Sequence, residues 1–117
     1  MAKVFHLLTP EEKKIFIKNG LYQPKSLKEV GFIHLSKADQ IDSIIKKFYQ
    51  KCERLLIWRI SENNLSDYLK YEPPLEAPNS GIKFPHYYSN LNMNHIEKEF
   101  TIQNINQQFK LPKDLLG

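Results

Sequence analysis

The sequence contains one cysteine, two arginines and no apolar run long enough to cross a membrane. Cys52 alone excludes an internal disulfide and supplies no thiolate pair for a metal. The first residues also lack the apolar core and the cleavage site of a secretory signal peptide. We therefore expect a cytoplasmic protein that has no membrane partner.

The net charge of +4 comes almost entirely from lysine, because Arg54 and Arg59 are the only arginines. Arginine is the residue preferred for bidentate contacts with phosphates and bases. The lysines are spread along the chain, and pairs such as Lys13–Lys14 are typical of solvated helix faces. This distribution disfavours a nucleic-acid partner.

The length of 117 residues is typical of one domain with a single hydrophobic core. Apolar runs and alternating patterns predict short strands. They cover residues 4–8, 31–35, 55–60, 68–72 and 96–102. Proline, glycine, asparagine and serine make residues 75–83 a predicted mobile loop that gates the site.

Two helices are predicted between the strands. Thr9 is the expected N-cap of the first, with Pro10 at its first position and Glu12 closing a capping box. Asn19–Gly20 is the expected end of this helix, with Ile15 and Phe16 in its buried stripe, and residues 21–30 are the expected linker. The second helix is expected to be capped by Ser36, with Asp39 at the capping-box position. Its buried stripe is Ile41, Ile44, Ile45 and Phe48.

The predicted fold is therefore α+β, with two helices packed on a small, mainly antiparallel split sheet. Three of the four histidines interrupt apolar or aromatic stretches: His6 and His34 in predicted strands, and His86 within 84–88. An imidazole in such a place needs hydrogen-bond partners or a position in a pocket. We expect the fold to bring the three together, whereas His95 lies in a polar stretch typical of a surface.

Other polar residues lie near these histidines. His34 and Ser36 point to the same side of a strand next to a helix start, which suits an anion but also suits a structural histidine and an ordinary cap. Glu72 at a strand end suits a general base or an acceptor for a ribose hydroxyl, or is simply solvated. The aromatic residues of 84–88 suit a platform for a planar ring, or the anchoring of a loop.

Several kinds of site are disfavoured. The sequence has no glycine-rich phosphate loop and no nucleophile elbow. No two histidines lie three or four residues apart, so no metal site is predicted. Cys52 lies among charged residues away from the candidate site, which disfavours a cysteine–histidine nucleophile.

Two segments resemble a bacterial family known as domain of unknown function 952. Residues 5–12 resemble its opening motif, and residues 26–36, followed by Gln40, resemble its central signature. The likeness covers about residues 3–102 and leaves 103–117 as a C-terminal extension. Leu35 replaces the usual cysteine of the family, and residues 87–91 depart from its isoleucine-tyrosine-glycine-proline-leucine run.

This family is similar in fold to the ADP-ribosyltransferase group, whose members hold NAD or an ADP-ribosylated intermediate between two small sheets. The resemblance implies catalytic roles for Glu72 and His34, with the carboxylate as the acid of the site. It implies ligand contacts for His6, Ser36, His86 and Tyr88, with His6 on a ribose hydroxyl. An arginine that binds NAD in some branches has no obvious counterpart here.

Three functions follow as alternatives. The first is an enzyme that acts on NAD or an ADP-ribose-like nucleotide, by ADP-ribosyl transfer or a related glycosidic or phosphate transfer, with NAD as a substrate and no other cofactor. The second is a noncatalytic nucleotide-binding module. The third is a protein-interaction domain with a basic surface.

Overall fold

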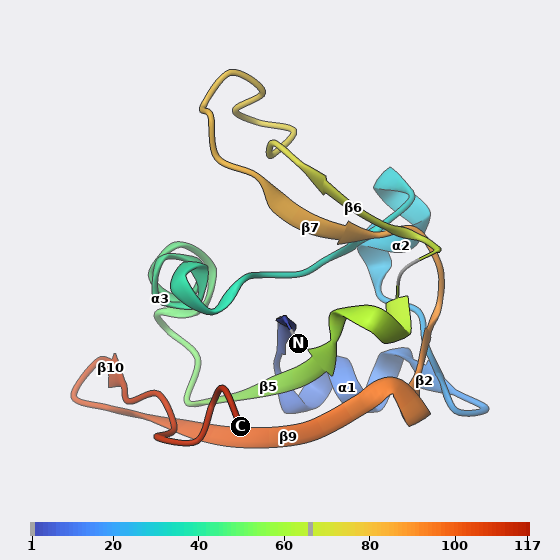
Figure 1. Cartoon of the computed structure of the whole chain (residues 1–117). Helices are drawn as coiled ribbons and strands as arrows, with labels where there is room; N and C mark the ends of the chain where they lie inside the picture. Colours follow the sequence, from blue (N-terminus) through green and yellow to red (C-terminus); the bar gives the residue numbers. More distant parts are fainter. Residues whose placement is uncertain (1, 66) are drawn as a thin grey trace.

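A computed structural model describes residues 2–65 and 67–117 and arranges their strands in three antiparallel sheets (Figure 1). The large sheet has the order β1 (Lys3–Leu8), β5 (Arg54–Ser61), β9 (Ile96–Ile105) and β10 (Gln108–Phe109). The second has the order β2 (Ile17–Lys18), β3 (Leu21–Tyr22) and β8 (Leu91–Asn92). The third, which we call the small outer sheet, has the order β4 (Ile33–His34), β7 (Phe84–Tyr87) and β6 (Leu69–Glu72).

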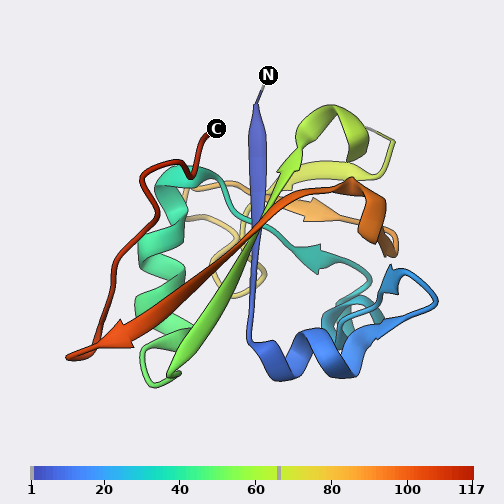
Figure 2. The ribbon, with the colours of Figure 1, turned by 90° about the horizontal axis from the view of Figure 1, so that it is seen from below.

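Helical segments join the strands. They are α1 (Pro10–Phe16), α2 (Lys25–Val30), α3 (Ile41–Ile44), its π-helical continuation Ile45–Tyr49, and single turns at Ala38–Gln40, Glu62–Leu65 and Met93–His95. The strands of the large sheet cross at steep angles in Figure 2, the twist expected of L-residues in a sheet. The fold is thus a small single α+β domain, as predicted, although it has a third short helix, α2. No helix within 2–65 or 67–117 is long and apolar enough to cross a membrane.

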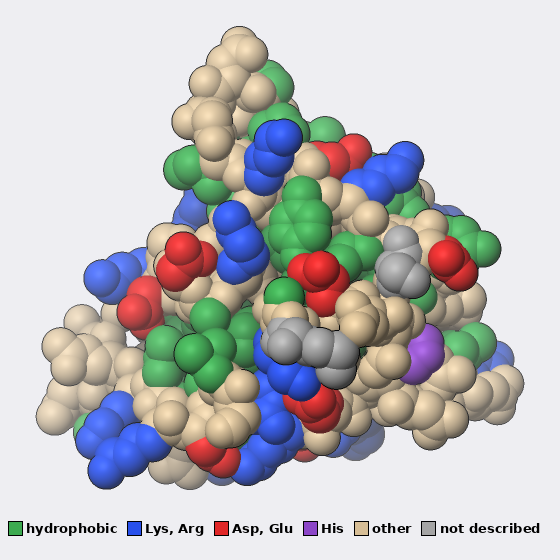
Figure 3. Space-filling view, in the orientation of Figure 1, with side chains coloured by type: hydrophobic (Ala, Val, Ile, Leu, Met, Phe, Trp, Pro, Cys, Tyr) green, Lys and Arg blue, Asp and Glu red, His purple; other side chains and the backbone are tan. Residues whose placement is uncertain are grey.

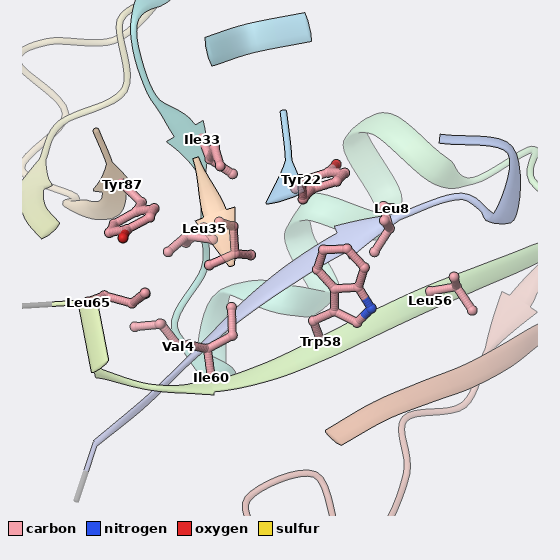
Figure 4. Close-up of a cluster of buried hydrophobic side chains, with 11 residues drawn as sticks. Val4, Leu8, Tyr22, Ile33, Leu35, Leu56, Trp58, Ile60, Leu65 and Tyr87 are labelled. Atoms are coloured by element: carbon pink, nitrogen blue, oxygen red, sulfur yellow. The ribbon is translucent and has the colours of Figure 1, made fainter. Parts of the chain in front are cut away.

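The large sheet has a hydrophobic cluster on each of its faces. Leu56, Trp58 and Ile60 of β5 join the cluster of Figure 4, which the two smaller sheets complete with residues such as Tyr22 and Tyr87. Leu55 and Ile57 alternate with them and join the other cluster, where α3 supplies Ile41 and Ile45. This alternation, with a period of two residues, explains why every residue of the predicted strand 55–60 except Arg59 is apolar.

The start of the first predicted helix is confirmed, but its end is wrong. The Thr9 hydroxyl accepts from the Glu12 backbone N–H at 3.1 Å, and the Glu12 carboxylate accepts from the Thr9 N–H at 2.9 Å. The helix ends at Phe16, however, and Asn19–Gly20 forms the turn of the β2–β3 hairpin, with φ of 53° and 75°. Two positive φ angles are those that a two-residue hairpin requires. Ile15, expected in the buried stripe, is 69% exposed.

The predictions for 21–30 and Ser36 are also wrong. Residues 21–30 form β3 and α2 rather than a linker. Ser36 does not cap a helix, because its backbone N–H and C=O pair with Phe5 of β1 at 2.7 and 2.8 Å. The helical segment predicted to follow Ser36 begins at Ala38. The residue at its capping-box position is Gln40 rather than Asp39, and the Gln40 side chain accepts from the Lys37 N–H at 2.9 Å. Phe48, expected in the buried stripe, is 61% exposed.

The later strand predictions are confirmed within small shifts. Strands β6 and β9 contain most of 68–72 and all of 96–102, and 75–83 contains no helix or strand. Phe100 and Ile102 of β9 are buried while Glu97, Glu99 and Thr101 are exposed, as the alternation predicts. In the segment 103–117, Leu115 joins the second hydrophobic cluster.

The hairpin turn generates the first prediction. Gly20→Ala should lower the free energy of unfolding by about 1 kcal/mol, because Cβ disfavours the left-handed conformation at φ 75° although no atom would clash with it. Asn19→Gly, the control, should leave stability unchanged or raise it. Chemical unfolding of both variants measures the difference, and equal stability of Gly20→Ala and the wild type would contradict the prediction.

Candidate functional site

The candidate site lies on the small outer sheet, whose two faces differ in chemistry. Ile33, Tyr87 and the neighbouring Leu35 join the hydrophobic cluster beneath the sheet. On the other face, His34 lies directly opposite His86 in the register of β4 and β7. Directly opposed residues point to the same face. The two imidazoles, far apart in sequence, therefore meet edge to face with their ring centroids 5.8 Å apart.

Glu72 is held by two donors from the β7 region. His86 Nδ1 lies 2.9 Å from Glu72 Oε1, and the Tyr88 hydroxyl donates to the same oxygen at 2.5 Å. The bonds from Tyr88 and then His86 are the main reasons why the pKa of Glu72 is lowered, and the bond to Glu72 raises the pKa of Tyr88 to about 12. Glu72 is therefore an ionised acceptor at neutral pH. Its side chain is 36% exposed.

His86 stacks on an aromatic side chain of the protein itself, that of Phe32. The Phe32 ring stacks on the His86 ring at 3.9 Å with an interplanar angle of 19°, and both side chains are buried. Phe32 also contacts His34 edge to face and tilts against Tyr88. Phe32, which lies outside the motif 84–88, thus holds His86 against the sheet.

His34 is the exposed histidine of the site. Desolvation, followed by the neighbouring His86, lowers the pKa of His34, while Glu76 opposes this shift. A histidine with a lowered pKa is predominantly neutral at pH 7 and can accept a proton. His34 and Glu72 thus lie on the two outer strands, on either side of β7.

His6 lies beneath these residues and is buried. Its Nδ1 lies 2.7 Å from the carbonyl oxygen of His34, and its Nε2 lies 2.8 Å from the Tyr22 hydroxyl. Because a carbonyl only accepts, Nδ1 carries the proton and Tyr22 donates to Nε2. Burial lowers the pKa of His6 to about 4. The ribose contact that the resemblance implies for His6 would require one of these bonds to break.

The structure brings four of the six predicted site residues together. His34, Glu72, His86 and Tyr88 share the outer face. His6 is buried beneath it, and Ser36 is buried where its backbone joins β1. Three further residues contact the predicted site residues and are not implied by the resemblance. They are Phe32, Tyr22 and Lys70. For Phe32 a signal existed, since it lies two residues before His34 and so faces the same side of an extended segment.

No group of three or more His, Cys, Asp and Glu residues within 2–65 and 67–117 could hold a metal ion. On the face shown in Figure 3, Lys and Arg side chains lie interspersed with Asp and Glu. An open hollow of about 700 Å³ lies elsewhere, and its lining includes Thr9, Cys52 and Asn104.

The chain matches a known protein family and is similar in fold to a protein of solved structure. Residues 7–99 match the model of a family described as a protein of unknown function, DUF952, so the chain belongs to that family. The crystal structure of protein CC0527 from Caulobacter crescentus is 22% identical and has a TM-score of 0.81, covering 97% of this chain and 98% of that chain. Its solution structure is 23% identical, with a TM-score of 0.74, covering 93% and 91%. No curated protein matches the chain.

The burial of His6 generates the second prediction, which concerns stability and pH. The folded pKa of His6 lies near 4 and the unfolded value is 6.5, so between these values the unfolded chain binds more protons. The contribution of the neutral, buried His6 to the free energy of unfolding is therefore complete above pH 6.5. It is lost as pH falls towards 4, by up to about 3 kcal/mol in total. His34, whose pKa is also lowered, acts in the same direction.

Chemical unfolding from pH 8 to 4.5 measures this loss. A His6→Asn variant keeps a donor in the place of Nδ1 but has no group that titrates there. It should be less stable than the wild type at pH 8 by roughly 2 kcal/mol, because Tyr22 loses its acceptor. Its stability should also fall less steeply as the pH is lowered. A wild-type slope in His6→Asn would show that another group causes the pH dependence.

Proposed function

We propose that this protein is an enzyme that acts on NAD or an ADP-ribose-like nucleotide at the outer face of the small outer sheet. The resemblance of the family to the ADP-ribosyltransferase group suggests this class. The strongest support on the molecule is the Glu72 carboxylate, which is ionised, partly exposed and held on one oxygen by two donors. Both donors bind Oε1, which leaves Oε2 to accept from a ligand hydroxyl.

The proposed roles follow from the chemistry of the ribose–nicotinamide bond. As this bond breaks, its electron pair leaves with nicotinamide and positive charge develops on the ribose. A carboxylate bound to a ribose hydroxyl stabilises that charge more in the transition state than in the ground state. An acceptor then bonds to the ribose carbon, and neutral His34 on β4 takes the proton that the acceptor loses.

His86, Tyr88 and His6 have supporting roles in this proposal. His86 and Tyr88 hold the Glu72 carboxylate in one orientation through its Oε1. His6 binds the His34 backbone carbonyl and so positions the strand that carries the proposed base. Tyr88 is partly exposed and is the member of this group that can also contact a ligand.

A thermal-shift screen with NAD, ADP-ribose, other nucleotides and small anions tests the proposal. A ligand held by the native state at 100 times its dissociation constant adds about 2.7 kcal/mol and raises the melting temperature by several degrees. Release of nicotinamide from NAD then separates an enzyme from a noncatalytic binding module. No shift with any nucleotide would favour the protein-interaction alternative.

The third prediction concerns Glu72. Glu72→Gln keeps the shape and an oxygen for His86 and Tyr88, but removes the charge. Turnover should therefore fall by roughly two to three orders of magnitude, while the dissociation constant of the nucleotide changes little. Glu53→Gln, an exposed site on the far hollow, is the control and should retain wild-type turnover. Unchanged turnover in Glu72→Gln would exclude the proposed role.

The fourth prediction concerns residues 75–83, which lie in the loop that joins Glu72 to β7. We propose that it gates the site. The loop contacts the segment 40–47. The Gln40 side-chain amide donates to the Lys83 carbonyl at 2.9 Å, and Lys47 and Glu76 form an exposed ion pair at 3.3 Å. The residues 75–83 contain no helix or strand and are mostly exposed, so their amides should exchange hydrogen rapidly without ligand and more slowly with a bound nucleotide. Slow exchange in the free protein would contradict a gate.

A further inference from the structure

Three nitrogen-bearing side chains form a row across the outer face of the small outer sheet. His34 lies opposite His86, and His86 lies opposite Lys70 on β6. Opposed residues share a face, and neighbouring strands are about 4.8 Å apart, so the row crosses all three strands. Its two ends, His34 and Lys70, are exposed, whereas its middle residue is buried.

Lys70 lies against an aromatic ring and, among the described residues, is not within ion-pair distance of a carboxylate. After the bonds from Tyr88 and His86, the charge of Lys70 also helps to lower the pKa of Glu72. Its Nζ lies 5.1 Å from the centroid of the Tyr88 ring. Of the described residues, the lysines found in ion pairs with carboxylates are Lys3, Lys13, Lys47 and Lys98. An aromatic face attracts a cation without using its N–H donors. The three donors of Lys70 are thus available to a ligand.

The two carboxylates near the row have other partners, although Oε2 of Glu72 is left as an acceptor. Glu72 uses Oε1 for Tyr88 and His86, and Glu76 pairs with Lys47. Lys70 and Glu72 lie two residues apart on β6 and share its outer face. The face therefore offers a hydroxyl acceptor and a phosphate-binding cation side by side, and a phosphorylated ribose carries both matching groups.

We propose that Lys70 binds a phosphate group of the nucleotide and makes the site select phosphorylated ribosides over neutral nucleosides, with an N–H of His34 as a second donor. This inference rests on the proposed function and adds the part of the ligand that Lys70 contacts. An ammonium group binds phosphate as a point charge and supplies charge-assisted hydrogen bonds. Glu72 takes a hydroxyl of the ribose that bears this phosphate.

Calorimetric titration of the full chain tests the inference with four ligands. ADP-ribose and ribose 5-phosphate carry a diphosphate and a single phosphate, and adenosine and ribose carry none. For the wild type, each phosphorylated ligand should bind at least tenfold more tightly than its neutral counterpart. Lys70→Gln should weaken the binding of the phosphorylated ligands about tenfold and change that of adenosine less than twofold. Lys70→Arg should restore most of the loss.

Lys18→Gln is the matched control, since Lys18 is an exposed lysine on β2 of the second sheet. It should bind all ligands as the wild type does. A thermal melt of each variant checks that it is folded. If Lys70→Gln binds ADP-ribose and ribose 5-phosphate as tightly as the wild type, or weakens adenosine equally, Lys70 does not recognise phosphate.

The outcomes distinguish this inference from the proposed function. A wild type that binds adenosine and ADP-ribose equally well overturns the phosphate-binding role and leaves the nucleotide site intact. A wild type that binds none of the ligands overturns both. Loss of ADP-ribose binding alone in Lys70→Gln assigns Lys70 to the diphosphate, whereas loss of both phosphorylated ligands assigns it to the phosphate next to the ribose.

Discussion

The buried imidazole of His6 is the point at which the three sheets meet. It belongs to β1 of the large sheet, bonds the His34 carbonyl of β4 in the small outer sheet, and bonds the Tyr22 hydroxyl of β3 in the second sheet. Its ring also packs against Trp58, which Tyr22 contacts edge to face. A neutral ring with one donor and one acceptor satisfies both partners, and burial keeps it neutral.

The geometry of the outer face depends on this junction. Strand β4 is only two residues long, and its position relative to the large sheet is set by the His6 bond and by the pairing of Ser36 with Phe5. Once β4 is in place, its register with β7 sets His34 opposite His86. Phe32 then covers His86, whose Nδ1 turns to Glu72. A structural histidine thus supports a face on which a second histidine is exposed.

The likeness to CC0527 indicates that nearly all of the chain takes part in this fold. At 22% identity the likeness concerns the fold alone, and it covers 97% of this chain, beyond the residues 7–99 of the family model. The C-terminal segment accordingly has structural contacts of its own. Leu115 joins the cluster beneath α3, and Arg59 donates to the Asp114 carbonyl at 3.0 Å.

Local interactions determined much of the architecture directly. The capping box at Thr9, the apolar run of β5 and the alternation in β9 could each be predicted, because every one depends on neighbours in the sequence. Asn19–Gly20 is equally informative but ambiguous, because that dipeptide is typical both of a helix end and of a tight hairpin turn. Tertiary structure alone decided the partners of the histidines. Two-residue strands such as β4 have no register until distant strands pair with them, so only the assembled sheets could bury His6, expose His34 and set Lys70 in line with His86.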